Sequence, residues 1–165
     1  MKEFVEHALN IARLKWARYA DIRIVERREQ VVSVKNGNVD GIGDQVSHGF
    51  GVRVLMNNSW GFASSAYLNK SEIERVTTLA VQIAKASGAV SGERVDIGDA
   101  VKSVGQYTTP IEIDPFTVSL EEKLDLLFKA DALMRRNAGV KVVESNVLCV
   151  RIQKFFGNIV LKSKC

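Results

Sequence analysis

The sequence predicts an α+β protein, a two-layer sandwich in which a meandering antiparallel sheet has its helices packed on one face. Three observations predict this class. The chain opens with apolar residues at helical spacing, continues with a long stretch of two-residue alternation, and returns to helical spacing twice after about residue 69. Because four strands are expected in a row before the second helix, hairpins are expected to connect them.

The first helix is expected over residues 2–18, where apolar residues recur every three or four positions on one face. Trp16 lies at the end of this stripe, and we expect it to pack in the core rather than to form a binding platform. The stripe consists of Phe4, Val5, Ala8, Leu9, Ala12 and Trp16.

The period changes to two from Asp21 onward, which predicts a continuous strand with one apolar face. The charged residues in its middle indicate that it runs out into solvent or carries a bulge near Glu29. Asn36-Gly37 then predicts a hairpin turn, because both residues tolerate a positive φ, and a return through residues 39–46. The apolar face consists of Ile22, Ile24, Val32 and Val34.

The stretch "HGFGVRVLMNNSWGFASS" (residues 48–65) allows two interpretations, a phosphate-binding loop or a hairpin. A dinucleotide loop needs a third glycine and a following helix, and a Walker loop needs a lysine and a hydroxyl. Here Gly49 and Gly51 precede the strand-like "VRVL". We therefore predict a hairpin, with strands at 51–55 and 60–63 joined at Asn57-Asn58, and glycines that mark bulges or close backbone approach.

The second helix is expected to begin at a cap, Asn69 or Ser71, with Glu72 or Glu74 as its capping-box partner. We expect it to end at Gly88 and to bury a stripe of small and branched residues. That stripe consists of Ile73, Val76, Ala80, Ile83 and Ala84.

The third helix opens with a capping box, Ser119 to Glu122, and is expected to end at Gly139. The following "VKVVESNVLCVRIQKFF" is strand-rich and is expected to hold one or two strands. The third helix's apolar stripe consists of Leu120, Leu124, Leu127, Phe128 and Met134.

These elements suggest three parts of the chain. Residues 1–88 form an N-terminal α+β domain. Residues 89–118, which contain both prolines and much Gly, Ser and Asp, form an extended linker. Residues 119–165 form a helix plus strands.

Composition narrows the classes of partner. The formal net charge is +4, from 23 basic and 19 acidic residues, and no basic face with interleaved aromatic residues emerges. We therefore expect no nucleic-acid partner. No apolar run approaches the roughly 20 residues of a membrane helix, and the chain opens without an apolar signal core. Two cysteines without CxxC spacing favour a cytoplasmic location.

Three segments carry a family resemblance. "YADIRIVERREQVVSVKNGNVDGI", the glycine-bearing hairpin and "YTTPIEIDPFTVSLEEKLDLL" resemble the N-terminal domain of the TldD/PmbA family, closer to the TldD side. The resemblance covers about residues 4–158. It implies a family of zinc metallopeptidases, the "modulator of DNA gyrase" family, in which a TldD subunit pairs with a PmbA-type partner to degrade or trim unstructured peptides.

The chain also departs from that family's pattern. The family's zinc site is an HExxxH helix with a later cysteine in the C-terminal half of a much longer protein, and this sequence contains no HExxxH. After "FFGN" the chain reads "IVLKSKC" instead of a serine- and glycine-rich segment. We expect a truncated member that lacks the catalytic zinc half, with residues 159–165 packing poorly. The alternative is a non-catalytic binding or dimerisation domain, or a gene remnant.

Individual candidate residues support no site. His48, Cys149 and Asp44 could in principle surround a zinc ion, but no ligand pair has a local spacing. We interpret His48 as a strand-edge residue and Cys149 as a small buried one. Ser64-Ser65 lacks a GxSxG elbow and ends the hairpin. Arg53 alternates outward and meets solvent or a partner.

The resulting prediction names no catalytic, cofactor-binding or metal residue in this chain, which alone should neither retain zinc nor hydrolyse peptides. Zinc is expected only in the full-length family member. By the resemblance, the chain is expected to form a homodimer, or a heterodimer with a PmbA-type subunit.

Overall fold

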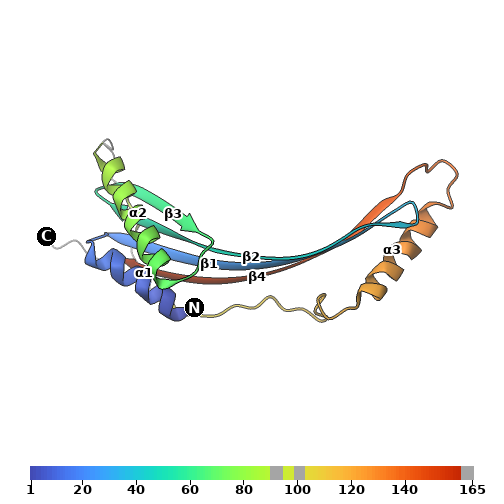
Figure 1. Ribbon diagram of the computed structural model, residues 1–165, viewed down its shortest axis with the longest axis horizontal. Coiled ribbons are helices and arrows are strands. Elements are labelled where there is room, and N and C mark those ends of the chain that lie inside the picture. Colours follow the sequence, from blue (N-terminus) through green and yellow to red (C-terminus); the bar gives the residue numbers. More distant parts are fainter. Residues whose placement is uncertain (90–94, 99–102, 161–165) are drawn as a thin grey trace. The chain divides into compact units, whose positions relative to one another are not determined.

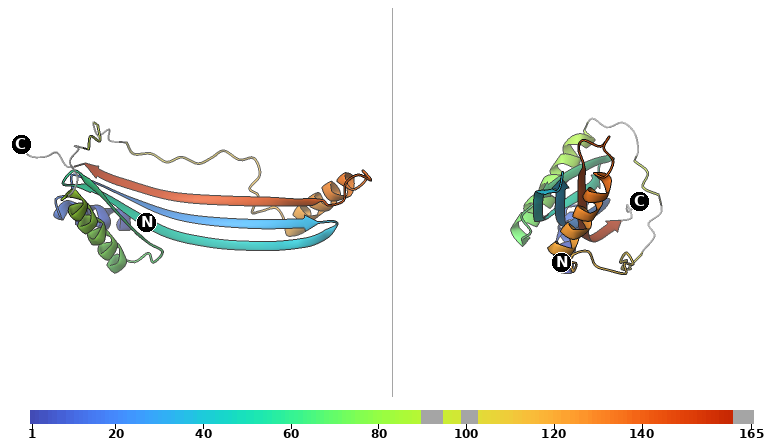
Figure 2. Two further views of the ribbon diagram at one scale, coloured as in Figure 1. Left: turned by 90° about the horizontal axis from the view of Figure 1, so that it is seen from above. Right: turned by 90° about the vertical axis from the view of Figure 1, so that its right-hand side faces the viewer.

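The computed structural model describes residues 1–89, 95–98 and 103–160. Within them, four strands form one open antiparallel sheet of order β3-β2-β1-β4, accompanied by three helices (Figures 1 and 2). The α+β class is therefore confirmed. The elements are α1 (Lys2–Leu14), β1 (Tyr19–Lys35), β2 (Asn38–Met56), β3 (Ser59–Ser65), α2 (Lys70–Gly88), α3 (Leu120–Met134) and β4 (Glu144–Val160).

The chain forms two compact units. Unit 1 comprises Met1–Glu26, His48–Val104 and Gln153–Cys165, and unit 2 comprises Arg27–Ser47 and Gly105–Ile152. Strands β1, β2 and β4 each contribute one part to unit 1 and another to unit 2. No helix in the described ranges is long and apolar enough to cross a membrane.

Helix α1 ends earlier than its apolar stripe predicts. Trp16 takes a left-handed conformation with φ 64°, and the amides of Trp16 and Ala17 donate to the carbonyls of Arg13 and Ala12 at 3.0 and 3.1 Å. This pair of bonds is a Schellman motif, which terminates a helix. The left-handed turn leaves Trp16 83% exposed, so its expected place in the core is wrong.

Strands β1 and β2 are joined by the predicted turn. Asn36 and Gly37 have φ values of 49° and 78°, as a two-residue hairpin requires. The two strands expected at 39–46 and 51–55 are one strand, β2, of 19 residues. Three strands rather than four therefore precede α2. Glycine lacks a side chain but has the backbone N–H and C=O groups that pair in a sheet. Gly49 and Gly51 therefore do not interrupt the strand.

The hairpin of residues 48–65 is confirmed. Asn57 and Asn58 both have positive φ, 49° and 61°, and antiparallel pairing runs from Met56↔Ser59 to Phe50↔Ser65. Gly61 shows the close backbone approach that its sequence context predicts. A Cβ atom there would lie 2.5 Å from the amide nitrogen of Ala84 in α2. The phosphate-loop interpretation is thereby excluded.

The core of unit 1 lies between one face of the sheet and helices α1 and α2 (Figure 1). Helix α2 begins at the predicted cap Asn69, whose side chain accepts from the amide of Glu72 at 2.9 Å, and runs to Gly88. The predicted burial is wrong for one residue of the stripe, Ile83, which is 36% exposed. The buried α2 residues are Ile73, Val76, Thr77, Ala80, Val81 and Ala84.

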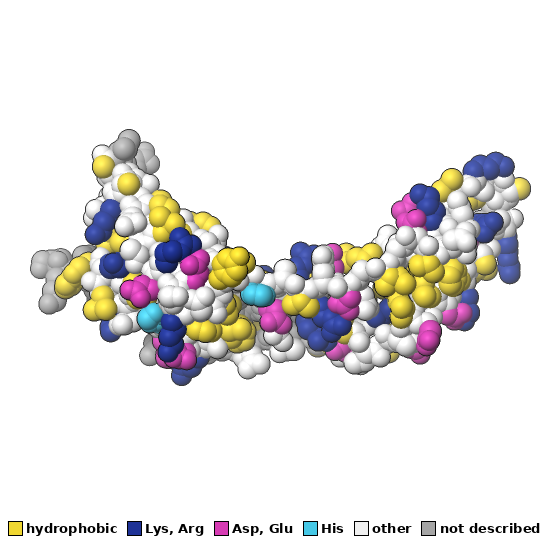
Figure 3. Space-filling view, viewed as in Figure 1, with side chains coloured by type: hydrophobic (Ala, Val, Ile, Leu, Met, Phe, Trp, Pro, Cys, Tyr) yellow, Lys and Arg dark blue, Asp and Glu magenta, His cyan; other side chains and the backbone are white. Residues whose placement is uncertain are grey.

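Unit 2 has a smaller core, in which Val32 and Val34 of β1 pack with Leu127 of α3. Both bonds of the predicted capping box are present between Ser119 and Glu122. The helix ends at Met134, not at Gly139, since the next residue caps it. Two expected stripe residues, Leu120 and Met134, are exposed along with Leu126 and Leu133, and hydrophobic side chains gather over α3 in Figure 3.

The strand-rich C-terminal stretch is one strand, β4, of 17 residues. Its residue Ile159 packs against the core of unit 1, so the expected poor packing is wrong for this residue, and residues 161–165 lie outside the described part. The described residues of the expected linker, 89, 95–98 and 103–118, form no helix or strand.

Candidate functional site

A buried carboxylate lies on the sheet face of unit 1 that the helices leave uncovered. Along β1, Ile22 and Ile24 face the helices, so Asp21 and Arg23 face the other way. Asp21 is nevertheless only 2% exposed. Its Oδ2 accepts a hydrogen bond from Nε of Arg53 on β2 at 2.8 Å and forms an ion pair with Nη2 of the same side chain at 2.7 Å. A carboxylate buried to this degree needs a partner that compensates its charge, and Arg53 is that partner.

Two aromatic rings surround the guanidinium of Arg53. Its central carbon lies 4.7 Å from the ring centroid of Trp60 and 5.9 Å from that of Tyr19, and the two rings meet edge to face at 5.7 Å. Burial works against the charge, yet the hydrogen bond to Asp21 raises the pKa of Arg53. The guanidinium is therefore a fixed positive charge in an aromatic setting, with its side chain 41% exposed.

The same face continues to both sides. On β3, Phe62 pairs across with Arg53, and its ring covers the position where Gly51 has no side chain. On β1, Arg23 lies 3.6 Å from Asp21 Oδ1 and places its guanidinium over Phe156 of β4, 5.6 Å from the ring centroid. We call this set the Arg53 surface; it consists of Tyr19, Asp21, Arg23, Arg53, Trp60, Phe62 and Phe156.

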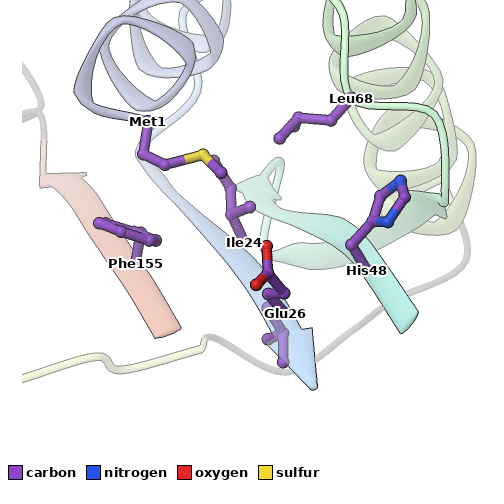
Figure 4. A pocket seen from close by; sticks show the side chains of 7 residues that line it. Met1, Ile24, Glu26, His48, Leu68 and Phe155 are labelled. Carbon is purple, nitrogen blue, oxygen red and sulfur yellow. The ribbon is translucent and has the colours of Figure 1, made fainter. Parts of the chain in front are cut away.

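A shallow pocket of about 240 Å³ lies on the helix-covered side of unit 1. Figure 4 shows Glu26 of β1 and His48 of β2 at its edge, with the carboxylate and the imidazole both directed toward the side where Leu68 lies. The rest of its lining is apolar, and both polar residues are exposed. The lining residues are Met1, Ile24, Val25, Glu26, His48, Leu68 and Phe155.

The three residues considered for zinc are not brought together. His48 belongs to unit 1, whereas Asp44 and Cys149 belong to unit 2. Asp44 accepts from Nε and Nη2 of Arg28 at 3.1 and 2.8 Å, and Arg28 lowers the pKa of this carboxyl. Cys149 is a buried free thiol. In the described ranges no group of three His, Cys, Asp or Glu residues is arranged to hold a metal ion, so these residues do not fit a zinc centre.

The remaining candidate residues, Ser64 and Ser65, contribute to local structure. Ser64 and Ser65 end β3, and the Ser65 hydroxyl accepts from the amide of Tyr67 at 3.1 Å. The sequence has one other histidine, His7, which lies in α1.

Unit 2 carries a second arginine cluster, which holds the end of the linker. The ring of Phe116 lies 4.7 Å from the guanidinium carbons of both Arg28 and Arg151. Asp114 pairs with Arg151 and accepts from the amide of Phe116 at 3.0 Å. The arrangement anchors a loop to the sheet, and each of its charged groups has a partner.

The sequence predicts only part of the Arg53 surface. Alternation placed Arg53 outward, but Asp21 was not distinguishable from a solvated acid at the start of a strand. The usable signal was an acid and an arginine at outward positions of two strands that a hairpin joins, with aromatic residues on the third.

Comparison with known proteins defines the class of this fold. Residues 20–84 match the family model for PmbA/TldA metallopeptidase domain 1. The chain is 32% identical over 109 residues to a metalloprotease of Methanocaldococcus jannaschii, covering 66% of this chain and 24% of that protein. It is 31% identical over 112 residues to a metalloprotease of Methanothermobacter thermautotrophicus, covering 68% and 23%.

Solved structures agree in fold. TldE from Thermococcus kodakarensis superposes with a TM-score of 0.71 at 13% identity, covering 94% of this chain and 34% of that one. A Thermotoga maritima protein whose name refers to modulation of a DNA gyrase gives 0.73 at 18% identity, covering 96% and 35%. The chain thus carries an N-terminal domain of the TldD/PmbA family. It spans about a quarter of the length of the metalloproteases it matches.

Proposed function

We propose that this chain is the N-terminal domain of a TldD-like zinc metallopeptidase that degrades or trims unstructured peptides, with the catalytic zinc held outside residues 1–165. The match of residues 20–84 to domain 1 of the PmbA/TldA metallopeptidases carries the proposal. The two archaeal metalloproteases support the same class of activity. Since Asp44, His48 and Cys149 do not fit a zinc centre, no catalytic step is assigned to them.

A chimera tests the proposal. Residues 1–165 replace the matching segment of the M. jannaschii metalloprotease, and cleavage of an unstructured peptide is compared with that of the same protein lacking the segment. We expect chelator-sensitive cleavage by the chimera and little by the shortened protein. An inactive chimera that is folded and loaded with zinc would contradict the assigned role.

The isolated chain provides the complementary measurement. After dialysis we expect no tightly held zinc and no peptide cleavage. A stoichiometric zinc ion with chelator-sensitive cleavage by the chain alone would overturn the placement of the catalytic centre elsewhere.

We further propose that the domain pairs with a second TldD/PmbA-type subunit in the cytoplasm. Exposed apolar side chains on edge strand β4, namely Leu148, Val150 and Ile152, support an association. The buried free thiol of Cys149 fits a reducing compartment. Light scattering of the chain with and without a PmbA-type protein measures the pairing, and a monomer in both samples contradicts it.

A further inference from the structure

We propose that the Arg53 surface binds an extended acidic peptide segment, whose carboxylates meet the guanidinium groups of Arg53 and Arg23 while the peptide lies over Trp60 and Phe62. The choice of a peptide as the occupant rests on the proposed function. The preference for acidic side chains rests on the surface itself.

The local charge is unbalanced. Among the residues that the structure describes, Arg53 and Arg23 pair with one carboxylate, that of Asp21, whose Oδ2 faces Arg53 and whose Oδ1 faces Arg23. The side chains of Arg53 and Arg23 are 41% and 61% exposed, whereas that of Asp21 is 3% exposed. The positive charge of this surface therefore reaches solvent and the negative charge does not. A ligand that brings a carboxylate supplies the missing counter-charge.

The arginine is held in place before any ligand arrives. Asp21 fixes the Nε–Nη2 edge of Arg53, and the ring of Trp60 lies 4.7 Å from its guanidinium carbon. A guanidinium that is already oriented loses little conformational entropy on binding. Its aromatic surroundings replace part of the water that would otherwise screen a new ion pair. Both effects favour recognition of a carboxylate at this position.

The aromatic part of the surface suits an extended chain. Trp60 and Phe62 are alternate residues of β3, so their side chains project on the same side, and both are exposed. β3 is an edge strand, and in the described part of the chain its outer edge pairs with no other strand. Rings spaced along a strand provide apolar contacts to successive side chains of a ligand, and the arginines beside them select its charge.

A single-stranded nucleic acid is the other ligand that binds aromatic rings on a sheet. Such ligands require a row of cations that follows the phosphates. Here the two arginines share one carboxylate, and Tyr19, Trp60 and Phe156 already contact guanidinium groups. The arrangement therefore fits one or two carboxylates better than a phosphate backbone.

Peptide binding to the whole chain tests the proposal. Two labelled, end-blocked peptides of equal length, rich in glycine and serine, carry either glutamates or lysines, and fluorescence anisotropy reports binding. We expect the glutamate peptide to bind about tenfold or more tightly than the lysine peptide, and added salt to narrow the difference. An oligothymidine of matching charge is titrated in parallel.

Matched variants locate the site. Arg23→Gln should weaken binding of the glutamate peptide about fivefold, whereas Arg27→Gln, the same change at an exposed site on the same strand, should not. Trp60→Ala should also weaken binding, and Trp16→Ala should not. Circular dichroism and thermal unfolding establish that each variant is folded.

Several results would overturn the inference. They are no binding of either peptide, equal binding of both, equal effects of Arg23→Gln and Arg27→Gln, or tighter binding of oligothymidine than of the glutamate peptide. The assay involves no cleavage, so its failure leaves the proposed peptidase role to be judged by the chimera, and an inactive chimera does not affect the binding result.

Discussion

Gly61 of β3 lies against the backbone of Ala80 in α2, so close that a Cβ atom would overlap the Ala80 carbonyl oxygen. The sheet and the helix can approach this closely only where the side chain is a hydrogen atom. Gly61 therefore permits the close approach of β3 and α2 at this point.

Gly61→Ala should destabilise the protein by about 2–3 kcal/mol, because α2 must move away from the sheet to admit a methyl group. Chemical unfolding monitored by circular dichroism measures the loss. Gly43→Ala is the matched control, since a Cβ atom at Gly43 meets nothing within 4 Å, and it should change stability by less than about 0.5 kcal/mol. Equal effects of the two substitutions would show that the contact is not limiting.

Trp16→Gly should stabilise the protein by about 0.5–1 kcal/mol. The left-handed conformation at φ 64° is strained for a residue with a Cβ atom and not for glycine, although glycine's greater freedom in the unfolded chain offsets part of the gain. Trp16→Ala keeps the Cβ atom and should not show the gain. If alanine stabilises as much as glycine, removal of the exposed indole rather than relief of backbone strain is the cause.

Local turns and caps could be predicted from the sequence, but the end of α1 could not. Asn36-Gly37, Asn57-Asn58 and the Ser119 capping box are local signals, and each forms the expected turn or cap. The end of α1 was missed because tryptophan is an unusual residue for a left-handed position. Trp16 continues the apolar stripe of the helix, which favoured a longer helix. A glycine at this position would have indicated the helix end.

The Arg53 surface could not be predicted from the sequence, and the reason is different. Asp21 and Arg53 are 32 positions apart, and whether an outward acid is solvated or buried under an arginine depends on how the strands pair. Similarly, β2 was expected as two strands because polar residues and glycines break its apolar alternation, while the strand itself continues through them.

Glu72 should make stability depend on pH below the ordinary glutamate range. Hydrogen bonds from Arg75, at 2.8 and 2.7 Å, and after them the hydroxyl of Ser65 lower the pKa of Glu72 from 4.5 to about 2. A carboxylate whose pKa is lower in the folded state stabilises the fold above its unfolded pKa, and this contribution is lost as the pH falls through the folded value.

Urea unfolding of the wild type and of Glu72→Gln checks this dependence. The wild type should be the more stable protein above pH 4.5, and the two should converge as the pH approaches about 2. Glu74→Gln, an exposed glutamate on the same helix, serves as the control and should show no such convergence. A constant difference between wild type and Glu72→Gln across this range would contradict the role of the Arg75 bonds.

Arg151→Gln should loosen the loop that Phe116 anchors in unit 2. The change removes one of the two guanidinium groups that flank the Phe116 ring, and with it the ion pair to Asp114. The amides of Phe116 and Thr117 donate within this loop, to the side chain and the carbonyl of Asp114 respectively, each at 3.0 Å. Because a partly exposed cation–π contact contributes about 1 kcal/mol, their hydrogen exchange should quicken roughly fivefold. Lys129→Gln also removes one positive charge, from an exposed i,i+4 ion pair on α3, and should leave the exchange of these two amides unchanged. Unaltered exchange in Arg151→Gln would mean that Arg28 and the turn at Asp114 suffice to hold the loop.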